Sequence, residues 1–422
     1  MNVLYRSVMR TVSVGVWAAP LFMAMAIAHQ AHGEGWQKTF GGAGAVQKSY
    51  SLQQVSDDGY IIVAVSTLFR VQQTTDGGYI IAGSAQSAGD SDVYLVKTDP
   101  VGNTQWEKTF GGEGNDYGYS VQQTADGGYI IAGVTGEGVA DSDADVYLIK
   151  TDAAGNIQWE QSFGGIGDDG GTSVQQTADG GYIVAGNTYS FGAGNIDAYL
   201  IKTDGAGNAQ WQKTFGGEGN DFGYSVQQTS DGGYIVAGLT ESSGSGGSDV
   251  YLVKTDGAGN PQWAKAIGGE YGDSANAVQQ TTDGGYIITG LTSGTGEAES
   301  DIYLIKTDGA GNPQWAKAIG GTANETGLSV QQTTDGGYIV AGNTYSFGAG
   351  NSDVYLVKTD TGGNVQWGKT FGGIGDDVGY TVQQTTDGGY IIVGNTLSFH
   401  SHGDVYLIKT DASGNAEWEK TP

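Results

Sequence analysis

The sequence predicts an all-β fold, a β-propeller of four-stranded antiparallel blades, and three observations support this prediction. A unit of 50 to 53 residues recurs, opening on a valine at positions 71, 121, 174, 226, 278, 330 and 382. Each unit contains four short stretches rich in β-branched and aromatic residues. Turn residues separate these stretches. Repeats of this length are typical of propellers and related arrays.

The four predicted strands of a unit are best seen in the copy that begins at Val71. They cover residues 71–74 (VQQT), 78–83 (GYIIAG), 92–99 (DVYLVKTD) and 103–110 (NTQWEKTF). Each is short and apolar enough to form a strand with at least one buried face. The pattern therefore predicts four antiparallel strands for each unit, in sequence order.

Two recurring turns connect these strands. Asp-Gly-Gly separates the first two, and glycine accepts the positive φ angles of a tight hairpin without steric cost. Thr-Asp-x-x-Gly-Asn separates the third from the fourth, and its aspartate can accept backbone N–H bonds. Each fourth strand carries one tryptophan, which we expect to pack between blades. These are Trp106, Trp159, Trp211, Trp263, Trp315, Trp367 and Trp418.

Seven complete units occupy residues 71–422, which predicts seven complete blades. Residues 29–70 hold a degenerate copy that lacks a third strand. Two alternatives remain for this copy. It forms a partial eighth blade, or it packs outside a seven-bladed ring and competes with residues 415–420 for the closing strand.

Residues 1–28 do not belong to the repeat and are expected to be a signal peptide. Arg6 and Arg10 precede an apolar run that ends in a small-x-small pattern at residues 26–28. An uncleaved N-terminal anchor is the alternative. Both interpretations place the repeats in the periplasm or outside the cell. If the signal peptide is cleaved, no membrane span remains.

The charge balance restricts the classes of partner. The 422 residues carry a formal net charge of −28, and Arg70 is the sole arginine outside residues 1–28. Nucleic acids and anionic membranes are bound through lysine and arginine, so we expect neither as a partner. The chain contains no cysteine, so disulfide bonds do not contribute to its stability.

The parity of the strands predicts where a ligand would bind. In an up-and-down blade, loops between strands one and two and between three and four lie on one face, and all other loops lie on the opposite face. The first face has uniform turns, whereas the second has the variable loops on which binding residues usually lie. Aromatic side chains of these loops are the candidate ligand-binding residues: Tyr189, Phe191, Tyr345, Phe347 and Phe399. Packing within the loop is the alternative role for them.

Two groups of residues are candidate metal ligands. Aspartates of the inter-blade loops lie among glycines, an oxygen-rich setting that suits a structural Ca²⁺, although ordinary Asx turns explain the same residues. They are Asp116, Asp168, Asp169, Asp221, Asp376 and Asp377. A weaker candidate is the cluster of His400, His402 and Asp404, which alternate on one segment. No other cofactor is expected.

The unit resembles the β-propeller repeat family of secreted and surface proteins in bacteria and archaea. The resemblance covers residues 36–422 and is carried by a G-x-x-x-D-x-G-Y entry, a D-x-G-Y-I turn, a DVYLIK strand and a G-N-x-x-W exit. It implies a propeller fold and an extracellular or envelope location. The family has no uniform activity, so the resemblance implies no mechanism.

The near-identity of the repeated units favours binding over catalysis. The segment NTYSFGAGN occurs at residues 187–195 and again at 343–351, whereas an enzyme needs a group of residues that occurs once. Similar loops around a ring offer several similar sites, whose weak affinities multiply against a repetitive target. We therefore expect a non-catalytic binding or scaffold protein for glycans or envelope proteins. The alternative is a glycan hydrolase or lyase that uses a pair of carboxylates.

Overall fold

The structure is a computed structural model, which describes residues 50–54, 60–65, 70–87, 90–137, 143–294, 300–399 and 404–421. The predicted signal peptide at residues 1–28 lies outside these residues. The same holds for His400, His402 and the side chain of Asp404, so the histidine cluster is not described.

Every complete unit folds into one sheet of four antiparallel strands that follow one another in sequence order. The first strands are β3 (Arg70–Gln73), β7 (Asn115–Gln123), β11 (Asp169–Gln176), β15 (Asp221–Gln228), β19 (Asp273–Gln280), β23 (Glu325–Gln332) and β27 (Asp377–Gln384). The second strands are β4 (Tyr79–Ser87), β8 (Tyr129–Glu137), β12 (Tyr182–Thr188), β16 (Tyr234–Thr240), β20 (Tyr286–Ser293), β24 (Tyr338–Thr344) and β28 (Tyr390–Thr396).

The other two strands complete each sheet toward the outside. The third strands are β5 (Asp90–Thr98), β9 (Asp145–Thr151), β13 (Asp197–Thr203), β17 (Asp249–Thr255), β21 (Ser300–Thr307), β25 (Asp353–Thr359) and β29 (Asp404–Thr410). The fourth strands are β6 (Thr104–Phe110), β10 (Ile157–Phe163), β14 (Ala209–Phe215), β18 (Pro261–Ile267), β22 (Pro313–Ile319), β26 (Val365–Phe371) and β30 (Ala416–Lys420).

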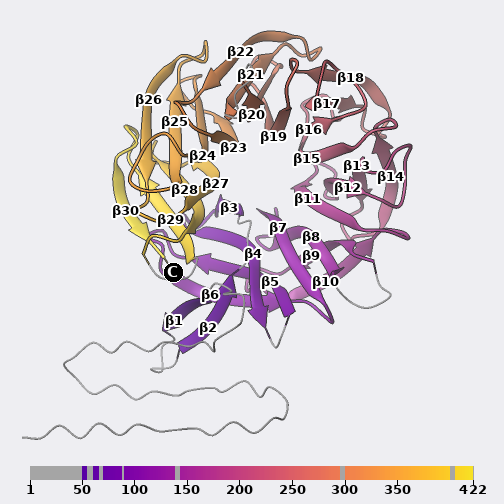
Figure 1. Cartoon of the computed structure of the whole chain (residues 1–422). Coiled ribbons are helices and arrows are strands. Elements are labelled where there is room, and N and C mark those ends of the chain that lie inside the picture. Colours follow the sequence, from indigo (N-terminus) through magenta and orange to yellow (C-terminus); the bar gives the residue numbers. More distant parts are fainter. Residues whose placement is uncertain are drawn as a thin grey trace, which may run out of the picture.

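The sheets stand side by side around a central axis, with the first strands at the centre and the fourth strands outside (Figure 1). Seven such blades form the ring within the described residues, which also contain no helix. The predicted all-β propeller of seven four-stranded antiparallel blades is therefore confirmed.

The hairpin turns divide the ring into two faces. The turn between β3 and β4 is closed by a bond from the Thr74 N–H to the Gly78 carbonyl, and the turn between β5 and β6 by one from the Asp99 N–H to the Asn103 carbonyl. Equivalent turns recur in every blade. We call this side the uniform face. The opposite side, the variable face, carries the loops between second and third strands and those between consecutive blades.

The second and third strands of each blade are buried on both sides because each blade packs between two neighbours. In β12, Ile183 packs toward the following blade, against Tyr234 and Val236. The adjacent Val184 packs toward the preceding blade, against Val146. Burial on both faces explains why these strands are continuous apolar runs rather than alternating ones. Each fully buried aliphatic side chain contributes roughly 1.5–3 kcal/mol.

The tryptophans join consecutive blades, as predicted. Trp211 of β14 packs against Tyr234 of the next blade in a tilted arrangement, with ring centroids 5.8 Å apart. It also covers Gly259 in the next blade's outer turn, where a Cβ atom would lie 2.8 Å from the indole ring. The G-N-x-x-W pattern thus combines a tryptophan with a glycine that receives the tryptophan of the preceding blade.

A ring of hydrogen bonds explains the Gln-Gln pair that recurs in each repeat. The first glutamine of one blade accepts a bond from the backbone N–H of the second glutamine of the next blade, at 2.5–2.7 Å. The series begins with Gln72 and Gln123 and ends with Gln383 of the last blade, which accepts from Gln73 of the first. The bonds therefore join all seven blades in a closed cycle.

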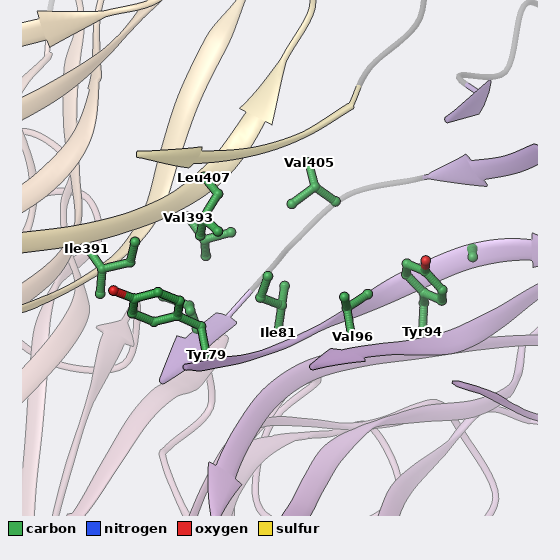
Figure 2. Packing of buried hydrophobic residues seen from close by; sticks show 10 residues of the cluster. Tyr79, Ile81, Tyr94, Val96, Ile391, Val393, Val405 and Leu407 are labelled. Carbon is green, nitrogen blue, oxygen red and sulfur yellow. The ribbon is translucent and has the colours of Figure 1, made fainter. Parts of the chain in front are cut away.

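The first and last blades meet through side chains, and the last blade contains only strands of its own unit. Figure 2 shows Tyr79, Ile81 and Val96 of the first blade facing Ile391 and Leu407 of the last. Trp418 contacts Tyr79 in the same way as the other tryptophans contact their partners, at 6.3 Å. The closing junction is thus built like the other six.

The N-terminal copy joins the first blade instead of forming a separate sheet. Strands β1 (Tyr50–Gln54) and β2 (Tyr60–Val65) form a hairpin, and β2 pairs with β4 through Val65 and Ala85. β3 pairs with the other end of β4 and is shorter than the first strands of the other blades. The outer strand of the last blade is β30, so the hairpin does not take the closing position.

Candidate functional site

The variable face gathers the exposed apolar side chains of the described residues. Nine of the twelve large hydrophobic residues that are exposed belong to its loops. Ile166 and Ile374, in the loops between blades, are 95% and 84% exposed. The other seven are Tyr189, Phe191, Tyr271, Tyr345, Phe347, Leu397 and Phe399. Sequence reasoning missed the isoleucines, although the repeated GGIGDD segment could have identified them.

The five predicted aromatic residues divide into two groups. The three phenylalanines lean on the tyrosine of the third strand in their own blade, with Phe191 at 5.9 Å from Tyr199 and equivalent contacts for Phe347 and Phe399. They anchor their loops, which is the alternative role named above. Tyr189 and Tyr345 have about half of their surface exposed and precede the anchor by two residues. These tyrosines are the better placed to contact a ligand.

The two identical loops at 187–195 and 343–351 are held by the same bonds. In the first, the Ser190 N–H donates to the Thr188 hydroxyl at 3.0 Å, and the Ala193 N–H donates to Asp197 at 2.9 Å. In the second, the corresponding distances are 3.0 Å and 3.0 Å. The ring therefore presents the same loop shape on two blades, β11–β14 and β23–β26.

The predicted calcium ligands do not form one kind of site. Asp116, Asp169, Asp221 and Asp377 are buried, with 0–1% of their surface exposed, at the start of first strands. Each accepts a bond from the N–H of a glycine four residues earlier, which closes the loop that precedes the strand. Asp168 lies apart from them, is exposed and accepts from the Ala144 N–H at 3.0 Å.

Each buried aspartate faces a second carboxylate that sequence reasoning did not assign to a site. This partner is the first residue of the DVYLIK strand in the preceding blade. A Cβ atom on Gly268, for instance, would lie 2.1 Å from an oxygen of Asp249 and 2.5 Å from an oxygen of Asp273. Six blade junctions carry such a pair around a glycine: Asp92–Asp116, Asp145–Asp169, Asp197–Asp221, Asp249–Asp273, Asp301–Glu325 and Asp353–Asp377.

In three of these pairs, one carboxylate has a raised pKa. Burial raises the pKa of Asp249, the N–H of Ser245 opposes this, and the charge of Asp273 raises the pKa further. Burial and the neighbouring carboxylates likewise raise the pKa of Asp145, and burial together with Asp377 raises that of Asp353. Two carboxylates that share a buried place disfavour the ionised form.

The uniform face shows the opposite arrangement, in which each buried lysine has a carboxylate partner. Lys254 is buried, and its ammonium lies 2.9 Å from Asp231 of the DGG turn and 2.8 Å from the Thr255 carbonyl. The second glycine of the turn makes room for it, since a Cβ on Gly233 would lie 2.6 Å from the ammonium. All seven blades carry this pair. These residues serve the fold.

In the part of the chain that the structure describes, no group of three or more His, Cys, Asp or Glu side chains is arranged so that it could hold a metal ion. None of the described segments forms a helix of the length and apolar character needed to cross a membrane.

Fold and site together define a seven-bladed β-propeller with repeated loops on one face. No protein-family model matches the chain. The regulatory protein FlaEY of Caulobacter vibrioides is 29% identical over 154 residues, which cover 33% of this chain. The chain spans 16% of the length of that protein.

Several solved structures are similar to this chain at low sequence identity. Puromycin hydrolase is 14% identical, with a TM-score of 0.50, over 85% of this chain and 55% of that one. YCF48 bound to the D1 peptide is 12% identical, with a TM-score of 0.48, over 82% and 93% of the two chains. Sqt1 of Chaetomium thermophilum is 13% identical, with a TM-score of 0.42, over 72% and 71%. At these identities the likeness concerns the fold alone.

Proposed function

We propose that the chain is a non-catalytic binding propeller of the cell envelope or extracellular space, which binds a repetitive glycan or surface protein through its variable face. The observation that carries this proposal is the repetition of one exposed loop on a rigid ring. Tyr189 and Tyr345 are presented by loops of the same sequence and the same hydrogen bonds. Tyrosine offers a flat apolar surface and a hydroxyl at a small entropic cost.

The blade repeat also supports membership of the secreted β-propeller repeat family of bacteria and archaea. An N-terminal signal peptide at residues 1–28 and the acidic composition fit an extracytoplasmic location. Both remain proposals, tested by sequencing the N-terminus of the mature protein from its native host.

The alternative of a glycan hydrolase or lyase is less favoured by the geometry. Such an enzyme needs two carboxylates in contact with the glycosidic bond. The carboxylate pairs of the variable face include Asp221 at one junction and Asp377 at another, both of which are buried beneath the loops and accept a bond from a glycine N–H. They are therefore poorly placed to reach a sugar.

A glycan array and a pull-down from envelope extract test the proposal with the full chain. We expect binding without product formation, and a loss of apparent affinity of at least about tenfold in Tyr189→Ala/Tyr345→Ala, because two weak sites act together. Val101→Ala is the matched control, since Val101 is an exposed residue of the uniform face. Equal affinity of the double variant, or release of a cleaved glycan, would contradict the proposal.

A further inference from the structure

The paired carboxylates at four blade junctions have oxygens without a partner. In the described structure, no hydrogen bond reaches the buried Oδ1 atoms of Asp145, Asp169, Asp221, Asp249, Asp273 and Asp377. At the junction of Asp249 and Asp273, both members have such an atom, and both residues are almost fully buried, with 1% and 3% of their surface exposed. A buried acceptor that lacks a partner is costly, and a buried charge without one is costlier.

The backbone holds the two carboxylates of each pair in a fixed relation. The Asp273 N–H donates to the carbonyl of Ser248, the residue before Asp249, at 2.7 Å. The same bond recurs at the junctions of Asp145–Asp169, Asp197–Asp221 and Asp353–Asp377, at 2.6–2.8 Å. This hydrogen bond thus joins strands of two different blades next to the two carboxylates. Repulsion between the charges is opposed by this tie and does not separate the blades.

A glycine packs against both carboxylates of each pair. A Cβ atom on Gly268 would overlap oxygens of both Asp249 and Asp273, and Gly216 and Gly164 occupy the same position at their junctions. Gly268 is itself exposed, so the buried pair lies directly beneath the surface of the variable face. Every junction with a carboxylate pair has a glycine here, which no turn conformation requires at Gly268 because its φ is not positive.

We propose that these four carboxylate pairs bind hard divalent cations of the Ca²⁺ class, one at each junction, and so fasten consecutive blades on the variable face. The four pairs are Asp145–Asp169, Asp197–Asp221, Asp249–Asp273 and Asp353–Asp377. Calcium accepts carboxylates, backbone carbonyls and waters in a flexible geometry, so two carboxylates and water from the exposed side form a suitable set. The bound cations also offset part of the net charge of −28.

This assignment differs from the ligand set expected from sequence. There, adjacent aspartates of one loop, such as Asp168 and Asp169, were grouped together. Here the second ligand comes from the third strand of the preceding blade, and Asp168 takes no part.

The test uses the full chain, freed of metal with EDTA and dialysed against CaCl₂. We expect the melting temperature to rise with Ca²⁺ concentration, as for any ligand that binds only the folded state. In Asp249→Asn/Asp273→Asn, the number of bound calcium ions falls by one, and the rise in melting temperature is smaller. In EDTA the same variant melts at or above the temperature of the unmodified chain, because two uncompensated charges have been removed.

Glu270→Gln serves as the matched control, since Glu270 is an exposed acid of the same loop, and it should bind the full number of ions. Luminescence of Tb³⁺ bound to the unmodified chain, and its displacement by Ca²⁺, provides a measurement that does not depend on the variant folding. Absence of Tb³⁺ binding, or an unchanged number of calcium ions in Asp249→Asn/Asp273→Asn, overturns the proposal. The pair would then share a proton instead of a cation.

Discussion

At the scale of single residues, the pKa values of aspartates on the two faces are shifted in opposite directions. Partial burial by itself raises the pKa of Asp231, but the Thr229 hydroxyl, the Lys254 ammonium and the Gly233 N–H outweigh it. The result is a pKa lowered from the usual 3.8 to about 2. The equivalent aspartate of every other blade has the same shift, for the same reasons. Three of the junction carboxylates, Asp145, Asp249 and Asp353, have a raised pKa instead.

A dependence of stability on pH follows from these shifts. A group whose pKa is lower in the folded state stabilises the fold above its unfolded value, and this contribution is lost as the pH falls toward the folded value. We expect the melting temperature of the chain to decrease between about pH 4 and pH 2. Protonation of Asp145, Asp249 and Asp353 acts in the opposite sense and begins at higher pH.

A single substitution tests whether the ion pair of Asp231 contributes to this decrease in melting temperature. Asp231→Asn should melt below the unmodified chain at pH 5, and the difference should shrink as the pH falls through about 2, where folded Asp231 becomes protonated. Circular dichroism melts at each pH measure this, with Glu270→Gln as the control. A difference between Asp231→Asn and the unmodified chain that is constant with pH would show that the ion pair with Lys254 contributes nothing.

At the scale of the element, the turn between the third and fourth strands serves the neighbouring blade as well as its own. Its glycine has a positive φ, 77° at Gly259, and lies under the tryptophan of the preceding blade. The first glycine of the DGG turn, Gly232, has a similar φ of 83° but no atom near the position of a Cβ. Substitution of Gly232 therefore measures the cost of the backbone conformation alone, whereas substitution of Gly259 adds the cost of a steric clash.

We expect Gly259→Ala to destabilise the chain more than Gly232→Ala does. Both changes force alanine into an unfavourable conformation, but the first also drives a methyl group into Trp211, which adds about 1–3 kcal/mol. Denaturant unfolding of the two variants gives the difference directly. Equal losses would mean that the indole ring of Trp211 moves aside without cost.

At the scale of the whole molecule, the closing junction differs from the other six in its connectivity. The closing junction has the same tryptophan contact, glutamine bond and apolar cluster, but no peptide segment links its two blades. Any weakening there permits the first and last blades to separate locally while the rest of the ring stays folded.

Trp418→Ala tests this consequence against Trp211→Ala. Each change removes a partly buried indole and should cost about 3 kcal/mol. We expect only Trp418→Ala to accelerate hydrogen exchange selectively in β3 and β27, because the covalent link between blades resists opening at Trp211. Exchange that accelerates evenly around the ring in both variants would show that the closing junction opens only with global unfolding.

By itself, the sequence determined the number of blades, the order of their strands, the separation of uniform and variable faces and the role of the tryptophans. These features follow from contacts within one unit and from its regular repetition. It did not determine which residues of different units meet. The cycle through Gln72 and Gln383 and the pairing of Asp249 with Asp273 depend on how strongly the ring curves, which no local pattern specifies. The same holds for Asp168 and Asp169, because only the tertiary structure shows that Asp169, at the start of β11, is the one that faces the junction.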